Sequence, residues 1–252
     1  MILDDAHEHV IEEENYFVSM TDMMVGLIFI FIIMLMYFAL QFQQVTEELA
    51  GANTTRTEIL QQIQASLAAK GVTVTIDTQN GVLRLPDSIL FDSGQAQLKP
   101  GGEDAVQKLA AALTEVLPCY TESTGIVARR ADCADTEHRI ESVYIEGHTD
   151  TDAFAGSGAL RDNWDLSVAR ATNTYRALVG NAEGLSSLCA QKEGRACEPV
   201  LSVSGYGEQR PIDSAGTPEA KSANRRIDLR IIMITPDAGQ TAAVVDEALR
   251  RQ

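Results

Sequence analysis

The stretch NYFVSMTDMMVGLIFIFIIMLMYFAL, residues 15–40, decides the architecture of this 252-residue chain. Residues 23–40 carry no charge, and as a helix they would span roughly 27 Å at about 1.5 Å per residue. The residues before them are acidic (DDAHEHVIEEEN), and no small-residue cleavage motif follows, which argues against a secretory signal peptide. The sequence therefore predicts a retained, single-pass transmembrane helix over residues 15–41.

One acidic side chain, Asp22, lies within this segment, and no other charge occurs between Glu14 and Glu47. A carboxylate at the bilayer centre costs roughly 2.5–3.5 kcal/mol, and less near an interface. Asp22 is therefore either an interfacial or helix-capping residue, or a carboxylate that carries an ion. Because a sodium ion needs several oxygen ligands and only Ser19 and Thr21 supply hydroxyls nearby, the sequence favours H+ over Na+, and no cofactor is expected.

The overall charge limits the partners. The chain has 36 acidic and 20 basic residues, a net charge of -16. Such a balance excludes nucleic acid and anionic lipid headgroups as partners, because both require Lys and Arg. The first basic residue is Arg56, so the positive-inside rule gives almost no information on the orientation of the helix.

The four cysteines form two local pairs, Cys119/Cys133 and Cys189/Cys197, and each pair brackets a loop-like stretch. Neither pair has the C-x-x-C spacing of zinc or thioredoxin-like sites, so no metal site is expected. The spacing is typical of two loop-closing disulfides in an oxidising compartment. The alternative is four reduced, partly buried thiols.

The segments around the apolar helix are predicted as follows. Residues 1–14 form an acidic tail, frayed or weakly helical, and residues 236–252 form a C-terminal tail with an amphipathic helical pattern. Residues 42–70 form a helical neck. Apolar or long side chains recur there in steps of three and four, which suits a parallel two-stranded seam. These positions are Phe42, Val45, Leu49, Ala52, Arg56, Ile59 and Ile63.

Beyond the neck, segments in which apolar residues have the spacing of strands alternate with segments in which they have the spacing of helices. The runs on either side of Gln79-Asn80-Gly81 predict a hairpin with Asn80 and Gly81 at positive φ. Helices are expected over EDAVQKLAAALTEVL and NWDLSVARATNTYRALVG. Strands are expected over ESVYIEGHTD, VLSVSGYGE and NRRIDLRIIMI. This order predicts an α+β sandwich, a mixed sheet with helices on one face.

Five ordered blocks, ILFDSGQAQL, IEGHTD, NWDLSVARA, GYGEQRP and NRRIDLRI, make residues 72–235 resemble the OmpA-like peptidoglycan-binding domain. The resemblance implies that Asp150 binds the ammonium of diaminopimelate and Arg170 its carboxylate. It also implies ligand contacts for Asn163 and Arg225 and weaker ones for Thr149 and Asn224.

Each of these residues also has a purely structural interpretation. Asp150 would cap a helix, and Arg225 would pair with Asp228 or with a carboxylate at the end of the sheet. His148 is expected to be a packed or hydrogen-bonding residue rather than a metal ligand. The segment TDAFAGSGALRD, residues 151–162, is longer than usual in that family, and it is expected to bring Asp152 and Arg161 to the edge of the groove.

The membrane segment, followed by a neck and an OmpA-like domain, resembles flagellar stator B (MotB-like) subunits, in which an Asp on the membrane helix carries the ion. The sequence TDMMVGLIFIF, the compact neck and the cysteine-bearing loops resemble the ZorB family of the Zorya anti-phage systems more closely. This resemblance implies a homodimer inside a ring of a multi-span, ZorA-like partner in the bacterial inner membrane. The N-terminus would be cytoplasmic and the C-terminal domain periplasmic.

Two alternatives remain, a flagellar-type stator subunit and a passive membrane-anchored peptidoglycan tether. An enzyme is not expected, because no nucleophile stands beside His148 and Asp150 in the sequence and the resembled family binds its ligand without cleaving it.

Overall fold

The computed structural model describes residues 4–124, 131, 133–156, 158–191 and 196–235, so the predicted C-terminal tail lies outside the described residues. The chain divides into one unit that ends at Leu49 and a second that comprises Ala50–Thr235. Helix α1 (Asp4–Ala69) contributes to both units. It is uninterrupted because it contains no proline, and glycine only at Gly26 and Gly51.

In the first unit, the side chains of residues 18–40 of α1 are exposed. The most apolar window of this helix has a mean hydropathy of 2.8, and none of that window is buried. Among the described residues, α1 is the one helix long and apolar enough to cross a bilayer. The predicted long apolar helix is confirmed.

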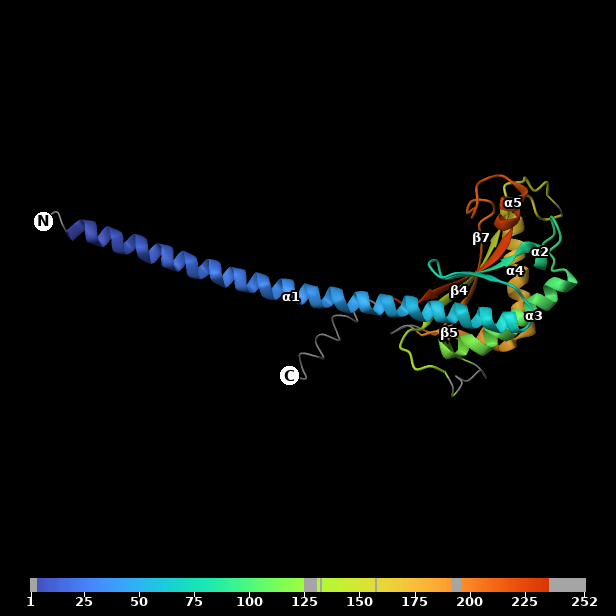
Figure 1. Ribbon diagram of the computed structural model, residues 1–252, viewed down its shortest axis with the longest axis horizontal. Coiled ribbons are helices and arrows are strands. Elements are labelled where there is room, and N and C mark those ends of the chain that lie inside the picture. The colour runs from blue at the N-terminus through green and yellow to red at the C-terminus, as the bar shows by residue number, and fades with distance from the viewer. Residues whose placement is uncertain (1–3, 125–130, 132, 157, 192–195, 236–252) are drawn as a thin grey trace. The chain divides into compact units, whose positions relative to one another are not determined.

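The second unit is built on a five-stranded sheet with the order β1-β2-β8-β4-β7 (Figure 1). Only β4 and β7 run parallel, and the other neighbours are antiparallel, so the sheet is mixed as predicted. The strands are β1 (Thr75–Asp77), β2 (Val82–Pro86), β4 (Ile140–His148), β7 (Leu201–Gly205) and β8 (Arg226–Met233).

Helices accompany this sheet, which confirms the α+β class. They are α2 (Asp87–Leu90), α3 (Pro100–Val116), α4 (Asn163–Asn181) and α5 (Pro218–Asn224), with short 3₁₀ turns η1 (Leu117–Cys119) and η2 (Glu183–Ser187). α4 lies against β4 and β7. A Cβ at Gly147 of β4 would lie 2.0 Å from the carbonyl oxygen of Ser167, so only glycine lets α4 approach the strand this closely.

The end of α1 corrects the predicted seam. Ile59 and Ile63 are 0% and 2% exposed and belong to the core of the second unit, together with Ala52, Leu60 and Leu67. Arg56 donates from Nη2 to the carbonyl oxygen of Gln79 in the hairpin, at 3.1 Å. The regular spacing of apolar residues suggests a contact between two copies. From Ala52 onward, however, this spacing arises because the helix is buried against its own domain. Phe42 and Leu49 stay exposed.

The hairpin of β1 and β2 is confirmed, but its predicted turn is wrong. Asp77 pairs with Val82, so residues 78–81 form the connection, and of these only Gly81 has a positive φ, 69°. The carboxylate of Asp77 accepts from the backbone and side-chain nitrogens of Asn80 at 3.1 and 2.9 Å. This side-chain contact closes the longer loop and makes a left-handed Asn80 unnecessary.

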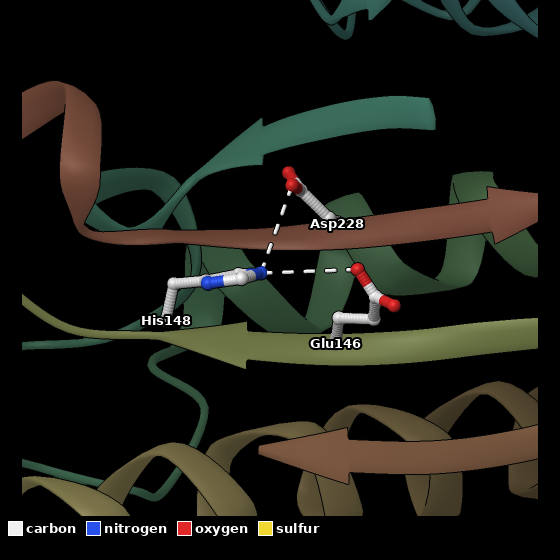
Figure 2. A group of neighbouring side chains, drawn as sticks. All are labelled: Glu146, His148 and Asp228. Carbon is white, nitrogen blue, oxygen red and sulfur yellow. Dashed lines mark ion pairs between the residues drawn. The ribbon is translucent and has the colours of Figure 1, made fainter. Parts of the chain in front are cut away.

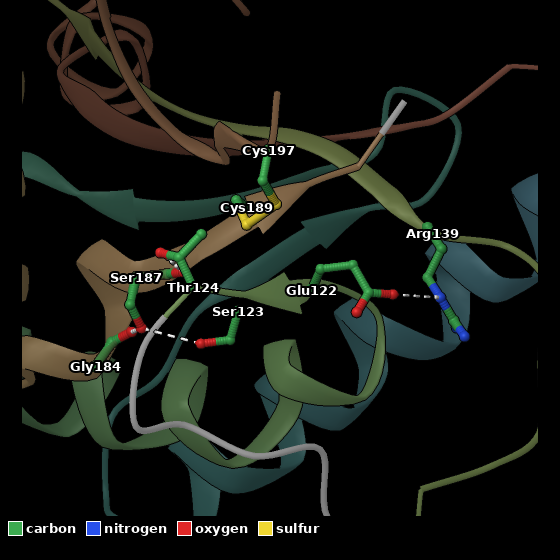
Figure 3. The surroundings of a disulfide bond; sticks show 8 residues. All are labelled: Glu122, Ser123, Thr124, Arg139, Gly184, Ser187, Cys189 and Cys197. Atoms are coloured by element: carbon green, nitrogen blue, oxygen red, sulfur yellow. Dashed lines mark hydrogen bonds and ion pairs between the residues drawn. A yellow bond between two sulfur atoms is a disulfide. The ribbon is translucent and has the colours of Figure 1, made fainter. Parts of the chain in front are cut away.

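A second sheet, absent from the sequence-based prediction, has three strands in the order β3-β5-β6. They are β3 (Glu122–Ser123), β5 (Leu188–Ala190) and β6 (Glu198–Pro199). Both predicted disulfides are present, Cys119–Cys133 and Cys189–Cys197. Figure 3 shows Cys197 bonded to Cys189 of β5, close to the Ser123–Ser187 hydroxyl contact. The disulfides thus fasten the ends of segments whose strands are too short to hold alone.

Candidate functional site

Strand register brings four charged side chains to one edge of the main sheet. Pro86 at the end of β2 and His148 at the end of β4 both pair with Arg226 at the start of β8. The residues just outside these pairs therefore meet at that edge. They are Asp87, Asp150 and Arg225, and α4 adds Arg170; we call these four residues the charge cluster.

Arg170 lies at the bottom of the charge cluster and is 2% exposed. Its Nη1 bonds Asp87 Oδ2 at 3.0 Å. Its Nε donates to the carbonyl oxygen of Gln95 at 2.8 Å, and Nη2 to that of Asp92 at 3.3 Å. The guanidinium also lies 5.1 Å from the ring centroid of Phe91. Arg170 thus fastens the loop after α2 to α4.

Arg225 is the accessible cation of the charge cluster, with a side chain 38% exposed. Its Nη1 bonds Asp150 Oδ2 at 2.5 Å, and its Nε lies 4.0 Å from Asp87 Oδ2. Asp150 does not cap a helix; its Oδ1 accepts from the backbone of Asp152 at 3.1 Å. Arg225 pairs with these two carboxylates at the end of the sheet, as one of its two structural alternatives predicted, while Asp228, the other predicted partner, pairs with the neighbouring Arg226.

The electrostatics of the charge cluster are those of a partly buried, alternating chain of charges. Burial raises the pKa of Asp87, against the opposing effect of Arg170 and Arg225. Burial likewise lowers the pKa of Arg170. The order Arg170, Asp87, Arg225, Asp150 alternates in sign and sums to zero. A ligand with one ammonium and one carboxylate can therefore replace an internal ion pair without leaving a buried charge unpaired.

The remaining predicted residues lie around the charge cluster with different roles. Asn163, the first residue of α4, donates from Nδ2 to the carbonyl oxygens of Asp152 and Asp150 at 3.0 and 3.4 Å. Thr149 is 4% exposed, and its buried hydroxyl has no hydrogen-bond partner among the described residues. Asn224 uses both ends of its amide on the 212–213 loop, accepting from Ile212 and Asp213 and donating to Asp213.

Of the two side chains that the segment 151–162 was expected to bring to the site, only Asp152 lies beside the charge cluster. Asp152 forms an ion pair with Lys221 at 2.5 Å, and its backbone touches Asp150 and Asn163. Arg161 is 81% exposed and forms its ion pair with Asp165, at 2.7 Å, rather than with the charge cluster.

Asp87 was missed by sequence reasoning, although it connects Arg170 to Arg225. Its signal is weak: a single carboxylate directly after the run VLRLP. A polar residue that follows a buried strand lies at the sheet edge, as Asp150 of GHTD does. By the same rule, the sequence could have identified Asp87 as a candidate site residue. Its pairing with Arg170 depends on the packing of α4, which no local pattern reports.

A second, fully buried group lies in the sheet beside the charge cluster: Glu146, His148 and Asp228 (Figure 2). His148 Nε2 lies 3.7 Å from Asp228 Oδ2 and 3.9 Å from Glu146 Oε2. Its ring stacks on Tyr206 at 5.3 Å between centroids, and burial lowers its pKa. His148 is thus a packed residue, as expected.

The three potential ligand atoms of this group lie within 4.8 Å of one another, a spacing that a metal ion could use. Both carboxylates, however, already have cationic partners. Arg230 holds Glu146 through two bonds of 2.8 Å, and Arg226 Nε bonds Asp228 at 3.0 Å. A divalent ion would lie against these guanidinium groups, so the residues do not fit a metal site.

Asp22, in the first unit, is exposed on α1 among the exposed apolar side chains of residues 18–40. Val18, Ser19, Thr21 and Val25 surround it on the helix surface. Within the described part of the chain, Asp22 is therefore presented outward on the apolar helix rather than packed against another element.

Residues 120–225 match the model of the OmpA family. This range holds the GHTD, NWDLSVARA and GYGEQRP blocks and Asp150, Arg170 and Arg225, so the OmpA-domain resemblance is confirmed there.

Motility protein B of Bacillus subtilis (strain 168) is 28% identical over 171 residues, which cover 68% of this chain and 49% of that protein. The chain thus matches about half of that relative's length. The solved periplasmic domain of Helicobacter pylori MotB is 15% identical, with a TM-score of 0.44 and coverage of 66% of this chain and 82% of that one. The cell wall anchor of the type VI secretion system (T6SS) from Pseudomonas aeruginosa is 17% identical, with a TM-score of 0.45 and coverage of 72% and 99%.

Proposed function

We propose that this chain is a peptidoglycan-binding, membrane-anchored subunit of a stator-type, ion-driven complex. The observation that carries the proposal is a combination within one chain. The apolar segment of α1, residues 18–40, exposes a single carboxylate, Asp22, and a folded domain places alternating charges at the edge of its sheet. The first suits a mobile ion and the second a fixed zwitterionic ligand.

The wall-binding half of the proposal rests on the charge cluster. The side chain of diaminopimelate ends in an ammonium and a carboxylate. Asp150 receives the ammonium. The resemblance assigns the carboxylate to Arg170, but that guanidinium is 2% exposed and already bonded to Asp87, so we assign the carboxylate to Arg225, which Arg170 supports through Asp87. The Asp150–Arg225 ion pair is thereby exchanged for two charge-assisted contacts to the ligand. Asn163 and Thr149 border the same space and supply neutral hydrogen bonds, and Asn224 fixes the loop before β8.

The test of this half is co-sedimentation of the full-length chain, in detergent or nanodiscs, with sacculi that contain diaminopimelate. Asp150→Asn keeps the shape but removes the charge, and we expect binding to fall at least about tenfold, since one buried charged contact is worth about 1.5–3 kcal/mol. Asp104→Asn, which removes an exposed carboxylate that pairs with Lys108 on α3, is the matched control and should bind fully. Equal binding by all three proteins would contradict the proposed site.

The ion-carrying half rests on Asp22. Two copies place their α1 helices inside a ring of a multi-span, ZorA-like partner in the bacterial inner membrane. The residues before the span face the cytoplasm, and the second unit lies in the periplasm, where disulfides form and persist. Uptake of a proton neutralises the carboxylate so that this helix face can pass apolar surface, and release lets it engage polar groups again. The wall-bound domain holds the pair fixed while the ring moves.

The biological role proposed is anti-phage defence, as a ZorB-type subunit. This proposal is based on the sequence of the membrane helix and on the cysteine-bearing loops. The similarity to Motility protein B supports a second candidate, a flagellar-type stator subunit. Neighbouring genes separate the two. A multi-span stator gene accompanied by nuclease or helicase genes supports defence, whereas flagellar genes would support motility.

A further inference from the structure

Trp164, the one tryptophan of the chain, is 45% exposed on the first turn of α4. Its position on the helix presents a large, flat aromatic surface to the solvent at a fixed place. Val168, one turn further along α4, is 44% exposed and extends the apolar surface. These two side chains make a strip narrower than a stable protein interface needs.

Trp164 is connected, through its neighbours, to the loop that carries Asp150. A Cβ at Gly207 would lie 3.6 Å from Trp164 Cδ2, so the indole lies next to the bare backbone of this residue, which has a φ of 53°. The carbonyl oxygen of Gly207 accepts from the backbone nitrogen of Thr149 at 2.9 Å. On the other side, Trp164 follows Asn163, whose amide bonds the Asp150 carbonyl. Trp164 therefore lies beside the loop that leads to Asp150 of the charge cluster.

Planar polar groups border the same turn of α4. Arg161 donates from Nε and Nη2 to the two carboxylate oxygens of Asp165 at 2.7 and 3.1 Å. Asp165 follows Trp164 on the first turn of α4, and Arg161, whose side chain is 81% exposed, lies just before the helix begins. An apolar plate beside a preorganised carboxylate and guanidinium matches a sugar ring, whose faces carry C–H groups and whose edge carries hydroxyls.

We propose that Trp164 is the sugar platform of the wall-binding site: it stacks on a hexosamine ring of the glycan strand whose stem peptide occupies the charge cluster, and Arg161 and Asp165 bond the hydroxyls of that ring. The inference rests on the proposed wall-binding function. It adds a contact with the sugar to the contacts with the peptide. The domain would therefore recognise the point where the stem peptide joins the glycan strand, rather than the peptide alone.

The test uses the fluorescence of Trp164 itself in the full-length chain in nanodiscs, excited where tyrosine does not absorb. A disaccharide that carries the diaminopimelate stem peptide should shift the emission and bind about tenfold more tightly than the same peptide without sugar. The free peptide should bind with little change in emission. Trp164→Ala, followed by calorimetry, should lower the affinity for the disaccharide peptide to that for the free peptide and leave the free peptide unaffected.

Equal affinities for the two ligands in the unmodified chain, or a sugar increment that survives Trp164→Ala, would overturn the inference while leaving the proposed function intact. Failure of both ligands to bind would instead refute the proposed function, and the inference with it. Val168→Ala, an exposed apolar truncation on the same helix, is the control for the fold and should leave the emission shift in place.

Discussion

Glu146 remains ionised inside the sheet because its neighbours outweigh its burial. Burial opposes the charge, but the contacts with His148 and the two bonds from Arg230 lower the pKa of Glu146 from 4.5 to about 2. Tyr206 adds a hydroxyl contact at 3.3 Å. A carboxyl whose pKa is lower in the folded than in the unfolded chain stabilises the fold above the unfolded pKa, and this contribution disappears as the pH falls toward the folded pKa.

The acid stability of the protein should therefore depend on Glu146. We expect the free energy of unfolding to fall by about 3 kcal/mol between pH 4.5 and about 2 from this group alone, an order-of-magnitude figure. Glu146→Gln should lower stability at neutral pH and remove much of this pH dependence, as followed by denaturant unfolding at several pH values. Glu115→Gln removes a surface partner of Lys70 and should change stability by less than about 1 kcal/mol. If the free energy of unfolding fell as steeply with decreasing pH in Glu146→Gln as in the unmodified protein, this account would be contradicted.

At the same scale, the sequence identifies the charge cluster only in part. Asp150 and Arg225 belong to motifs that the sequence displays, and the structure pairs them directly. The burial of Arg170 and its bond to Asp87 follow from the approach of α4 to Gly147. That approach is a tertiary contact between residues distant in sequence, so local patterns contain no signal for it.

Among the elements, the end of α1 is part of the globular fold rather than a spacer. Ile59, Leu60, Ile63 and Leu67 are at most 2% exposed and share one core with the sheet and α3. A heptad-like spacing cannot by itself distinguish a second copy from a sheet as the surface that covers the helix, because both select the same apolar stripe. Of the predicted seam positions, Phe42, Val45 and Leu49 precede the part of the helix that is buried in its own domain.

Truncation of this stripe should destabilise the second unit. Ile63→Ala removes a buried side chain that is 2% exposed, and we expect a loss of about 2–5 kcal/mol in the free energy of unfolding. Leu49→Ala alters a side chain that is 41% exposed and should cost less than about 1 kcal/mol. Chemical denaturation of the full-length chain, followed by circular dichroism, measures both. A loss confined to dimerisation, with unchanged unfolding of the domain, would restore the seam interpretation.

Element prediction succeeds where a segment is long and periodic and fails where it is short. The helices α3 and α4 and the strands β4 and β8 follow from their patterns. The strands β3 and β6 have two residues each, too few for any period, and exist because β5 and the two disulfides hold them. The hairpin turn was mispredicted because Asn80 bonds the Asp77 carboxylate instead of taking a left-handed conformation.

At the scale of the whole molecule, the two units hold different chemistry. Within the apolar segment of its helix, residues 18–40, the first presents a single carboxylate, Asp22, and the second presents a charge cluster that suits a zwitterionic ligand. A passive tether needs only the second. The proposed motor subunit needs both, because ion flow without a fixed domain would merely turn the dimer, and a fixed domain without Asp22 would transmit no force.

The most direct test is proton flux across membrane vesicles that contain this chain and the proposed multi-span partner, measured with a pH-sensitive dye. Asp22→Asn removes the titrating group while keeping the size of the side chain, and Asp22→Glu keeps the carboxyl as the matched control. The account predicts that flux is lost in Asp22→Asn, that it persists at least partly in Asp22→Glu, and that peptidoglycan binding is unchanged in both. Undiminished flux in Asp22→Asn, or no flux with Asp22 in place, would contradict the claim that this side chain carries the ion.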